Sequence, residues 1–423
     1  MSSEIKGKVI GLADGIEAGP SDEWISAACS IKKENENSYK EIINNLKSIY
    51  VELLTRFPQF RLKLPLMDNN LRYWALLDIE DCPFEKLIKT TDIPKEQLPE
   101  SFPLDELPIW RLYITETNDN KIRFRFSSSH SFVDGRSIFS FLDFFINLGQ
   151  TKKFSEDFLQ AENLPLTNSF KKKELFTKEI GENLQTPESW KKLKPYKLYP
   201  DVELPSHCVN TQWDFEYPPI SKFNRKYNVT CQALLMTIIE RAIRKYNKGK
   251  IDDLTLGVYA PVDTRQTKYA NDIHKKGKFF NAEGLMIVFI NKQKSIMDDI
   301  IHCKSELKKV LDTDESWVTY CYEQEFVDKD KKEMKFDDNF PMLNNSNLVF
   351  ASNIGKVCVG KEDVSFHPKS NVNEYGYWTT LYCLNNGKTL SVILVHPYNV
   401  EKELVNTIYD SVMEMINFIK DDK

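Results

Sequence analysis

The residue with the clearest chemical potential is His130, in the segment SSSHSFVDGRS at residues 127–137. Apolar residues alternate with arginines over residues 122–126, which predicts a half-buried strand that runs into this segment. If the strand continues, His130 lies on the same face as Phe124 and Phe126, aimed inward, with a helix following it. A neutral imidazole at such a place, partly desolvated and held by a turn, can transfer a proton near neutral pH.

Asp134 and Gly135 follow His130 in the segment where we expect the chain to turn from the strand into the helix. Two roles are open for Asp134. It can cap the helix that starts near Arg136 by accepting hydrogen bonds from backbone N–H groups, or it can form a buried ion pair that fixes the loop carrying His130. Neither role makes it a catalytic base. On spacing alone, an inward histidine is more often a hydrogen-bonded core residue than a catalyst.

Motifs for several other chemistries are absent from the sequence. There is no glycine-rich nucleotide loop, no P-loop and no Gly-x-Ser-x-Gly nucleophile elbow. The eight cysteines are scattered without zinc-ligand spacing, so we expect no metal. The remaining histidines have neither metal nor triad spacing: His207, His274, His302, His367 and His396.

Length and composition indicate an ordinary globular protein. The chain has 423 residues and a net charge of −5, and at about 150 residues per domain this predicts two to three domains. The near-balanced charge argues against a nucleic-acid partner. The first residues lack the apolar region of a secretory signal, and no apolar run approaches the ~20 residues of a membrane span. We therefore expect a cytoplasmic protein with reduced thiols and no transmembrane segment.

Hydrophobic periodicity predicts two α/β lobes. Helical spacing occurs at residues 42–54, ended by Phe57-Pro58, at 138–148, ended by Gly149, and in the second half at 229–246, 295–311 and 404–419. Strands are expected at 212–216, 254–260 and 285–290, and Asn386-Gly387 predicts a hairpin turn between 378–384 and 390–396. We assign residues 1–162 to an N-terminal lobe, 163–207 to a crossover linker and 208–423 to a C-terminal lobe.

The pattern His-x-x-x-Asp-Gly at residues 130–135 resembles the active-site motif of the chloramphenicol-acetyltransferase-like superfamily. That group includes alcohol acetyltransferases, plant BAHD acyltransferases, wax ester synthases and peptide-synthetase condensation domains. Its usual form has two adjacent histidines, and here Ser129 stands in place of the first. His130 matches the second histidine, which is the catalytic one in the family.

Further pieces of the family pattern occur in the expected order. Residues 54–61 (LTRFPQFR) resemble the end of the family's first helix, and 108–111 (PIWR) its Pro-Leu-Trp-Arg element. Residues 261–265 (PVDTR) are similar to the Val-Asn/Asp-x-Arg element of the second lobe, and 352–355 (SNIG) to the Ser-Asn-x-Gly segment of alcohol acetyltransferases and condensation domains. The Asp-Phe-Gly-Trp-Gly motif of the plant enzymes is missing, which argues against that branch.

The resemblance implies a two-lobe fold, each lobe a mixed sheet flanked by helices, with an active-site tunnel at the lobe interface. His130 would be the general base that takes the proton of a hydroxyl acceptor as the acceptor attacks an acyl-CoA thioester, with no acyl-enzyme intermediate. Asp134 would pair with Arg265 across the lobes in a structural role, next to Gly135. Ser352, Asn353 and Gly355 are candidates for lining the tunnel or binding the oxyanion, and a plain turn is the alternative for residues 353–355.

The implied partners are acyl-CoA as co-substrate, a small alcohol or lipid acceptor, and no permanently bound cofactor. We expect a monomer. Three alternatives stay open: transfer to an amine or a carrier-bound substrate, a catalytically silent relative that binds a lipid or a partner, and peripheral association with a membrane that carries a lipid acceptor. The predicted helices lack the basic polar face of an interfacial anchor, which argues against the last of these.

Overall fold

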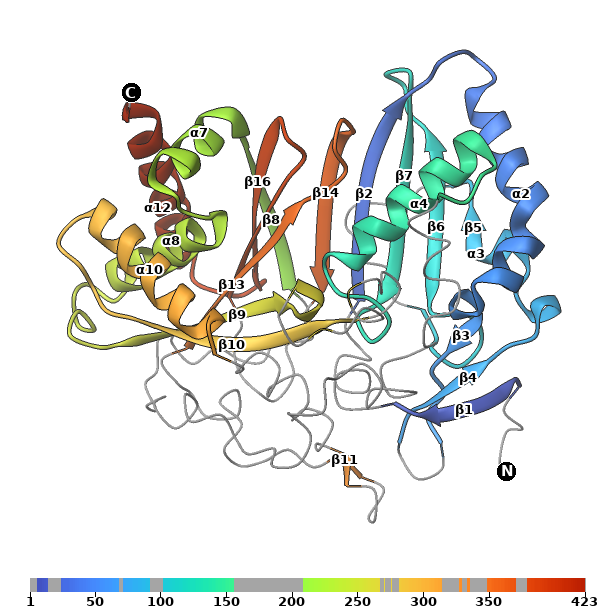
Figure 1. The fold of residues 1–423 in the computed structure, drawn as a ribbon, viewed down its shortest axis with the longest axis horizontal. Coiled ribbons are helices and arrows are strands. Elements are labelled where there is room, and N and C mark those ends of the chain that lie inside the picture. The colour runs from blue at the N-terminus through green and yellow to red at the C-terminus, as the bar shows by residue number, and fades with distance from the viewer. Residues whose placement is uncertain are drawn as a thin grey trace.

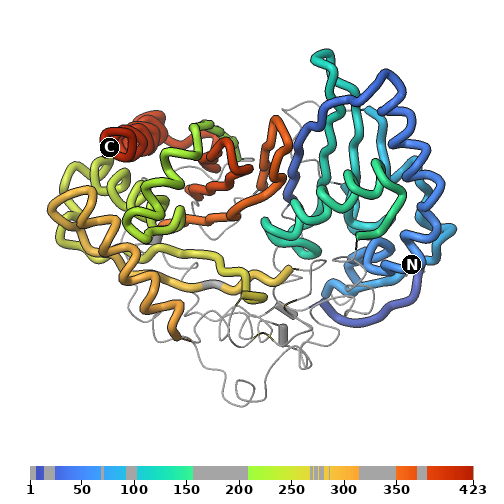
Figure 2. Tube along the Cα trace, turned by 45° about the horizontal axis from the view of Figure 1, so that its top comes forward, coloured from blue at the N-terminus to red at the C-terminus, as the bar shows by residue number. Residues whose placement is uncertain are grey.

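The computed structural model describes residues 6–13, 24–67, 71–91, 102–155, 208–266, 270, 275, 281–313, 327–328, 333–334, 348–369 and 379–422. The described chain forms two lobes that lie side by side, each built on its own mixed sheet (Figures 1 and 2). The linker predicted at 163–207 lies outside the described residues, so the proposed lobe boundaries stay a prediction.

The first sheet has five strands in the order β14-β2-β7-β6-β5. Their bounds are Glu362–Lys369 (β14), Trp24–Lys32 (β2), Lys121–Ser129 (β7), Trp110–Glu116 (β6) and Ile88–Lys89 (β5). Helices α2 (Ser38–Arg56) and α4 (Ser137–Thr151) pack against each other beside this sheet (Figure 1). A smaller sheet, β1-β4-β3, joins Lys8–Leu12, Tyr73–Leu76 and Leu62–Lys63. Short helical turns η2 (Pro58–Arg61), η3 (Ile79–Asp81) and α3 (Phe84–Leu87) complete the described part of this lobe.

The second sheet has six strands in the order β10-β9-β13-β15-β16-β8. They span Glu283–Ile290 (β10), Leu256–Asp263 (β9), Leu348–Lys356 (β13), Thr380–Asn385 (β15), Thr389–Pro397 (β16) and Cys208–Glu216 (β8). β13 runs parallel to both neighbours, and the other pairs are antiparallel. The helices of this lobe are α7 (Tyr217–Tyr227), α8 (Cys231–Tyr246), α10 (Ile296–Leu311) and α12 (Lys402–Asp421). The turn η6 (Thr264–Gln266) follows β9, and a short pair joins β11 (Val327–Asp328) to β12 (Glu333–Met334).

One strand crosses between the lobes. β14 comes from the second half of the chain, yet it pairs antiparallel with β2 at the edge of the first sheet, with Phe366 opposite Ala27. Lys121 of β7 reinforces this contact, with Nζ 3.0 Å from Asp363 Oδ2. The first sheet is therefore completed by a segment that the sequence analysis placed in the C-terminal lobe, and the two lobes share backbone hydrogen bonds.

Most of the expected elements are present with shifted ends. The hairpin at Asn386-Gly387 is confirmed: Asn386 Oδ1 accepts hydrogen bonds from the backbone N of Lys388 and Thr389 at 3.0 and 2.8 Å. The prediction that Gly149 ends its helix is wrong, because α4 continues to Thr151. Gly149 instead lets α4 approach α2, since a Cβ there would lie 2.9 Å from Ile42 Cγ2.

The strand before His130 is more deeply buried than predicted. Phe124 and Phe126 on one face of β7 are fully buried, but Arg125 and Ser127 on the other face are buried as well. Ser127 Oγ is 2.8 Å from Ser26 Oγ, so this hydroxyl has a partner inside the sheet. The half-buried prediction therefore holds only for the beginning of the strand.

Aromatic rings fill the space between the first sheet and its helices. The centroid of Phe60 lies 5.4 Å from Trp110, 5.3 Å from Phe141 and 5.4 Å from Phe145. Trp110 donates its indole N–H to the Phe60 carbonyl oxygen at 2.9 Å. The loop with His130 thus starts and ends on elements anchored in this cluster, β7 and α4.

Replacing Phe60 by alanine should lower the free energy of unfolding by about 3–5 kcal/mol, because it empties a fully buried site among rings. Urea unfolding followed by tryptophan fluorescence and circular dichroism measures this change. Tyr398→Ala is the control, since that ring is 52% exposed, and it should change stability by no more than about 0.5 kcal/mol. Equal effects of the two substitutions would contradict the assigned core.

Candidate active site

The loop between β7 and α4 carries the residues that the sequence analysis singled out. His130 directly follows the last residue of β7, and its side chain is 21% exposed. Ser129, which stands in place of the family's first histidine, is fully buried, and its Oγ accepts a hydrogen bond from the Ser131 backbone N at 3.2 Å. Ser129 therefore stabilises the turn that presents His130.

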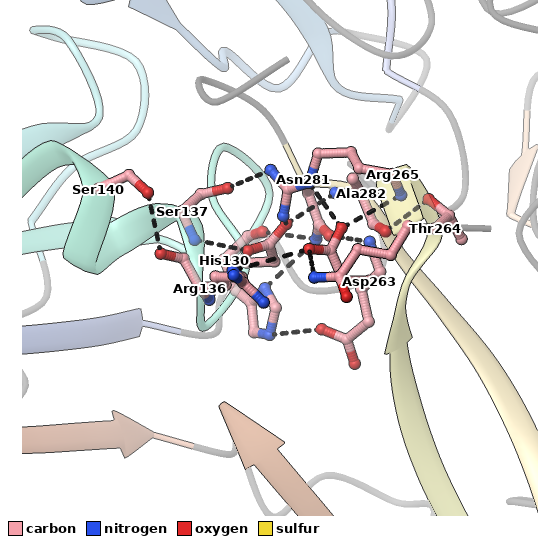
Figure 3. A network of polar contacts seen from close by, with 12 residues as sticks. His130, Arg136, Ser137, Ser140, Asp263, Thr264, Arg265, Asn281 and Ala282 are labelled. Carbon is pink, nitrogen blue, oxygen red and sulfur yellow. Dashed lines mark hydrogen bonds and ion pairs between the residues drawn. The ribbon is translucent and has the colours of Figure 1, made fainter. Parts of the chain in front are cut away.

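Asp134 fulfils both roles that the sequence left open, one with each carboxylate oxygen. Oδ1 accepts hydrogen bonds from the backbone N of Arg136 at 2.9 Å and of Ser137 at 2.7 Å, at the start of α4. Oδ2 accepts from Arg265 Nη2 at 2.7 Å and from the backbone N of Ala282 at 2.9 Å. One buried carboxylate thus joins the helix of the first lobe to two segments of the second. Figure 3 shows Ser137 of this helix close to Arg265 and Ala282 of the second lobe.

The charge of Asp134 is maintained against its burial. Desolvation alone would raise the pKa of this carboxyl, but the Arg265 guanidinium and the N–H groups of Ala282 and Ser137 outweigh it and hold the pKa below its usual value. Asp134 is therefore ionised at neutral pH with all its strong acceptor positions in use. It has no capacity left to act as a base.

Arg265 is the second-lobe half of this connection, as the resemblance predicted. It lies in η6, and its side chain is 9% exposed. Besides Asp134, it donates to Ser137 Oγ from Nη1 at 2.8 Å and to Asp263 Oδ1 from Nε at 2.6 Å. Three directions of the planar guanidinium are fixed in this way, which a lysine could not reproduce.

Two residues at the histidine were missed by sequence reasoning. Asn281 donates from Nδ2 to the His130 carbonyl oxygen at 3.0 Å, and the same Nδ2 is 3.3 Å from His130 Nδ1. Glu283 Oε2 is 3.6 Å from His130 Nε2, and its side chain is 24% exposed. Glu283 is the first residue of β10, where the register places it opposite Asp263 of β9, and Asn281 lies two residues before the strand. The sequence gives no signal for either residue, because their place beside the PVDTR element depends on this antiparallel pairing.

Gly135 lies where β13 meets the histidine loop. A Cβ on Gly135 would be 3.3 Å from Ile354 Cδ1, so a larger residue would require the Ile354 side chain to shift. On the same strand, Asn353 Oδ1 accepts from the Gly355 backbone N at 3.0 Å and from the Cys383 thiol at 3.3 Å, at a bulge in the β13–β15 pairing. This is the turn-like role that the sequence left open for residues 353–355.

The structure thus brings His130, Asp134, Gly135 and Arg265 together and places β13 against their loop. Ser352 lies on that strand opposite Tyr382 of β15. Oxyanion binding by Ser352, Asn353 or Gly355 stays a prediction, as does the tunnel. Within the described ranges, no group of three or more His, Cys, Asp or Glu side chains is placed to hold a metal ion.

Comparison with known proteins identifies the fold. No family model and no curated protein matches the sequence. Among solved structures, F. sporotrichioides TRI101 in complex with coenzyme A and T-2 is 12% identical, covers 96% of this chain and 98% of its own, and has a TM-score of 0.65. Polyketide synthase associated protein 5 from Mycobacterium tuberculosis is 11% identical over 96% and 97% of the two chains (TM-score 0.63). The epimerization domain of tyrocidine synthetase B is 13% identical over 99% and 98% (TM-score 0.60).

The chain therefore shares the two-lobe α/β fold of these solved structures, and the α/β fold class predicted from the sequence is confirmed. At 11–13% identity, the likeness establishes the fold and leaves the activity to be argued from the site.

Removing either partner of the Asp134–Arg265 pair should lower the free energy of unfolding by about 3–5 kcal/mol, because a buried charge is left unpaired. In urea unfolding, the double variant Asp134→Ala/Arg265→Ala should lose less than the sum of the two single variants. Alanine at both members of the exposed Glu52–Arg56 pair is the control and should have a much smaller effect. Strict additivity at Asp134 and Arg265 would contradict the assigned interaction.

The stabilisation by Asp134 should also depend on pH. Because its folded pKa lies below the unfolded value, the contribution is complete above the ordinary aspartate pKa of about 3.9 and is lost as pH falls through the lower folded pKa. The stability gap between wild type and Asp134→Asn in urea unfolding should therefore be constant from pH 7 to 5 and shrink below pH 4 or so. A gap that stays constant into acid would show that the folded pKa is not depressed.

Proposed function

We propose that the chain is an acyl-CoA-dependent acyltransferase that moves an acyl group from the thioester to a hydroxyl acceptor at His130. The observation that carries the proposal is the His-x-x-x-Asp-Gly loop joined to the second lobe by Asp134. That carboxylate contacts both Arg265 and Ala282, so His130 is presented at the junction of the lobes. The fold and the solved relatives complexed with coenzyme A support acyl-CoA as the co-substrate.

In the simplest version of the mechanism, His130 is the general base. A hydroxyl group is a poor nucleophile until a positioned base removes its proton in the transition state, and such catalysis contributes roughly 10² to 10⁴ in rate. The acceptor oxygen attacks the thioester carbonyl directly, and the thiol leaves without an acyl-enzyme intermediate. The tetrahedral oxyanion then requires hydrogen-bond donors close to the reacting carbon.

An amine acceptor is the second candidate, and one observation favours it. The Glu283 carboxylate, 3.6 Å from His130 Nε2, places negative charge where the nucleophile would sit, which suits a group that arrives as an ammonium ion. Transfer to a carrier-bound substrate belongs to the same alternative.

Among the described helices, none has the length and apolar composition required to cross a bilayer.

His130→Ala should fold like the wild type, because the loop is held in place by Asp134. It should lose roughly 10² to 10⁴ in turnover, because the imidazole is the base of the reaction. The assay is thiol release from acetyl-CoA and longer acyl-CoAs with a mixed panel of alcohols and amines, and thermal unfolding checks the fold. His302→Ala is the matched control, since that imidazole lies on α10, where it contacts Glu306 and the backbone N of Asn291. Undiminished turnover in His130→Ala would refute the catalytic assignment.

A further inference from the structure

Gln232 of helix α8 binds the backbone of strand β13 on the helix side of the second sheet. Its Nε2 donates a hydrogen bond to the Ala351 carbonyl oxygen at 2.9 Å, and its Oε1 accepts one from the Asn353 backbone N at 3.0 Å. The side chain is buried, and a flipped amide would set oxygen against oxygen and N–H against N–H at these contacts. Both ends of this amide are therefore engaged by one strand, on either side of Ser352.

Gln232 takes the place of a strand neighbour where the regular pairing of β13 ends. The pairing with β9 extends from Leu348 to Phe350, and the pairing with β15 has a bulge between Asn353 and Gly355. The two backbone groups that Gln232 binds lie between these points. An apolar side chain at position 232 would remove the partner of a buried carbonyl and of a backbone N–H, which is costly in a core. The glutamine therefore fixes the backbone of β13 at this place.

The strand geometry directs the side chain of Ser352 away from α8. Ala351 is fully buried in the core that α8 covers, and side chains alternate between the faces of a strand, so Ser352 shares the opposite face with Phe350. That face is turned toward the first lobe, because the register partner of Ser352, Tyr382, has its ring centroid 5.6 Å from that of Phe366 on β14. The half-buried hydroxyl of Ser352 is therefore presented at the junction of the lobes.

The two neighbouring candidates on this strand do not present a side chain at the junction. Asn353 Oδ1 accepts hydrogen bonds from the Gly355 backbone N at 3.0 Å and from the Cys383 thiol at 3.3 Å. Cys383 belongs to the buried core of the second lobe, so the Asn353 side chain lies on the helix side of the sheet. Gly355 has no side chain. Of the three residues, Ser352 is thus the one whose side chain can donate a hydrogen bond at the junction.

We propose that Gln232 is a positioning residue for the proposed transfer: it fixes the backbone of β13 around Ser352, whose hydroxyl donates a hydrogen bond to the carbonyl oxygen of the thioester. The proposal rests on the proposed function and keeps His130 as the base. As the acceptor attacks, the carbonyl electrons move to oxygen, and the hydroxyl keeps its proton while it stabilises that charge. When the carbonyl forms again, the C–S bond breaks with its electrons on sulfur, and His130 returns the acceptor's proton to the thiolate. Gln232 acts only through the strand, because it lies on the other face of the sheet.

Amide hydrogen exchange tests the contact without knowledge of the acceptor. The Asn353 N–H should be protected in the wild type, and Gln232→Met, which is similar in size but has no amide, should reduce this protection roughly tenfold or more. Thr237→Val is the matched control, because that buried hydroxyl of the same helix donates to the Ala233 carbonyl oxygen within α8. It should leave exchange at Asn353 unchanged. Unchanged protection of Asn353 in Gln232→Met would overturn the proposal.

Turnover tests whether the contact matters for the reaction. Thiol release from acyl-CoA is followed with the panel of alcohols and amines, at a temperature where each variant is folded by thermal unfolding. Ser352→Ala should lower kcat by roughly 10² to 10³, as expected for the loss of one oxyanion donor. Gln232→Met should lower kcat by roughly 10² without raising KM for acyl-CoA, because it misplaces a group that acts in the transition state. Thr237→Val should keep the wild-type kcat even where it lowers stability.

A double-mutant cycle separates positioning from a general loss of structure. In the Ser352→Ala background, Gln232→Met should change kcat by no more than about twofold, since the group that Gln232 positions is gone. Losses that multiply in the double variant, or wild-type kcat in either single variant, would overturn the proposal. If Gln232→Met does not fold, the same cycle is run with Gln232→Asn, whose amide is one CH₂ group shorter and cannot reach both backbone groups.

The failure of this proposal differs from the failure of the function on which it rests. In the outcomes above, the wild type releases thiol and only the role of Gln232 is overturned. No thiol release from the wild type with any acyl-CoA or acceptor would overturn the proposed function, and this role of Gln232 with it.

Discussion

The site depends on a single buried carboxylate that is shared between the two lobes. Asp134 uses one oxygen to start α4 and the other to hold Arg265 and the backbone of Ala282. Because it is 5% exposed, any loss of these partners would leave a charge in a medium that solvates it poorly. The contacts of Asp134 with Arg265 and Ala282 therefore set the position of His130 relative to the second lobe. The pairing of β14 with β2 is a second, independent connection between the lobes.

Local patterns of residue types in the sequence predicted part of the fold and of the site. Helical periodicity located α2, α4, α8, α10 and α12, and Asn386-Gly387 located a hairpin. The alternation before His130 located β7, and spacing alone could not decide between a cap and an ion pair for Asp134. The structure shows why both interpretations were reasonable: each describes one oxygen of the same carboxylate. The pairing with Arg265 could be predicted only through the resemblance, since 131 positions separate the two residues in sequence.

The features that could not be predicted all depend on long-range pairing. The sequence analysis predicts no strand at residues 362–369, and nothing in the residues of β14 says that its neighbour is β2. Asn281 and Glu283 are single polar residues in a chain that is 28% charged, so their types carry no signal. They can be assigned to the site only from the structure. The antiparallel pairing of β10 with β9 places them beside the PVDTR element, where Asn281 contacts His130. The prediction of the end of α4 was wrong for a similar reason, since Gly149 is explained by its close approach to Ile42 of another helix.

Strand β9, the turn η6 and strand β10 supply two distinct sets of groups to the histidine loop. Arg265 binds Asp134 and is itself held by Asp263, which ties the histidine loop to the second lobe. Glu283 adds a half-buried carboxylate 3.6 Å from the Nε2 atom of the imidazole, a placement that costs desolvation of the charge. A charge placed beside a histidine at the junction of the lobes is the physical reason to interpret this junction as a candidate reacting centre, since local energetic compromises concentrate at functional sites.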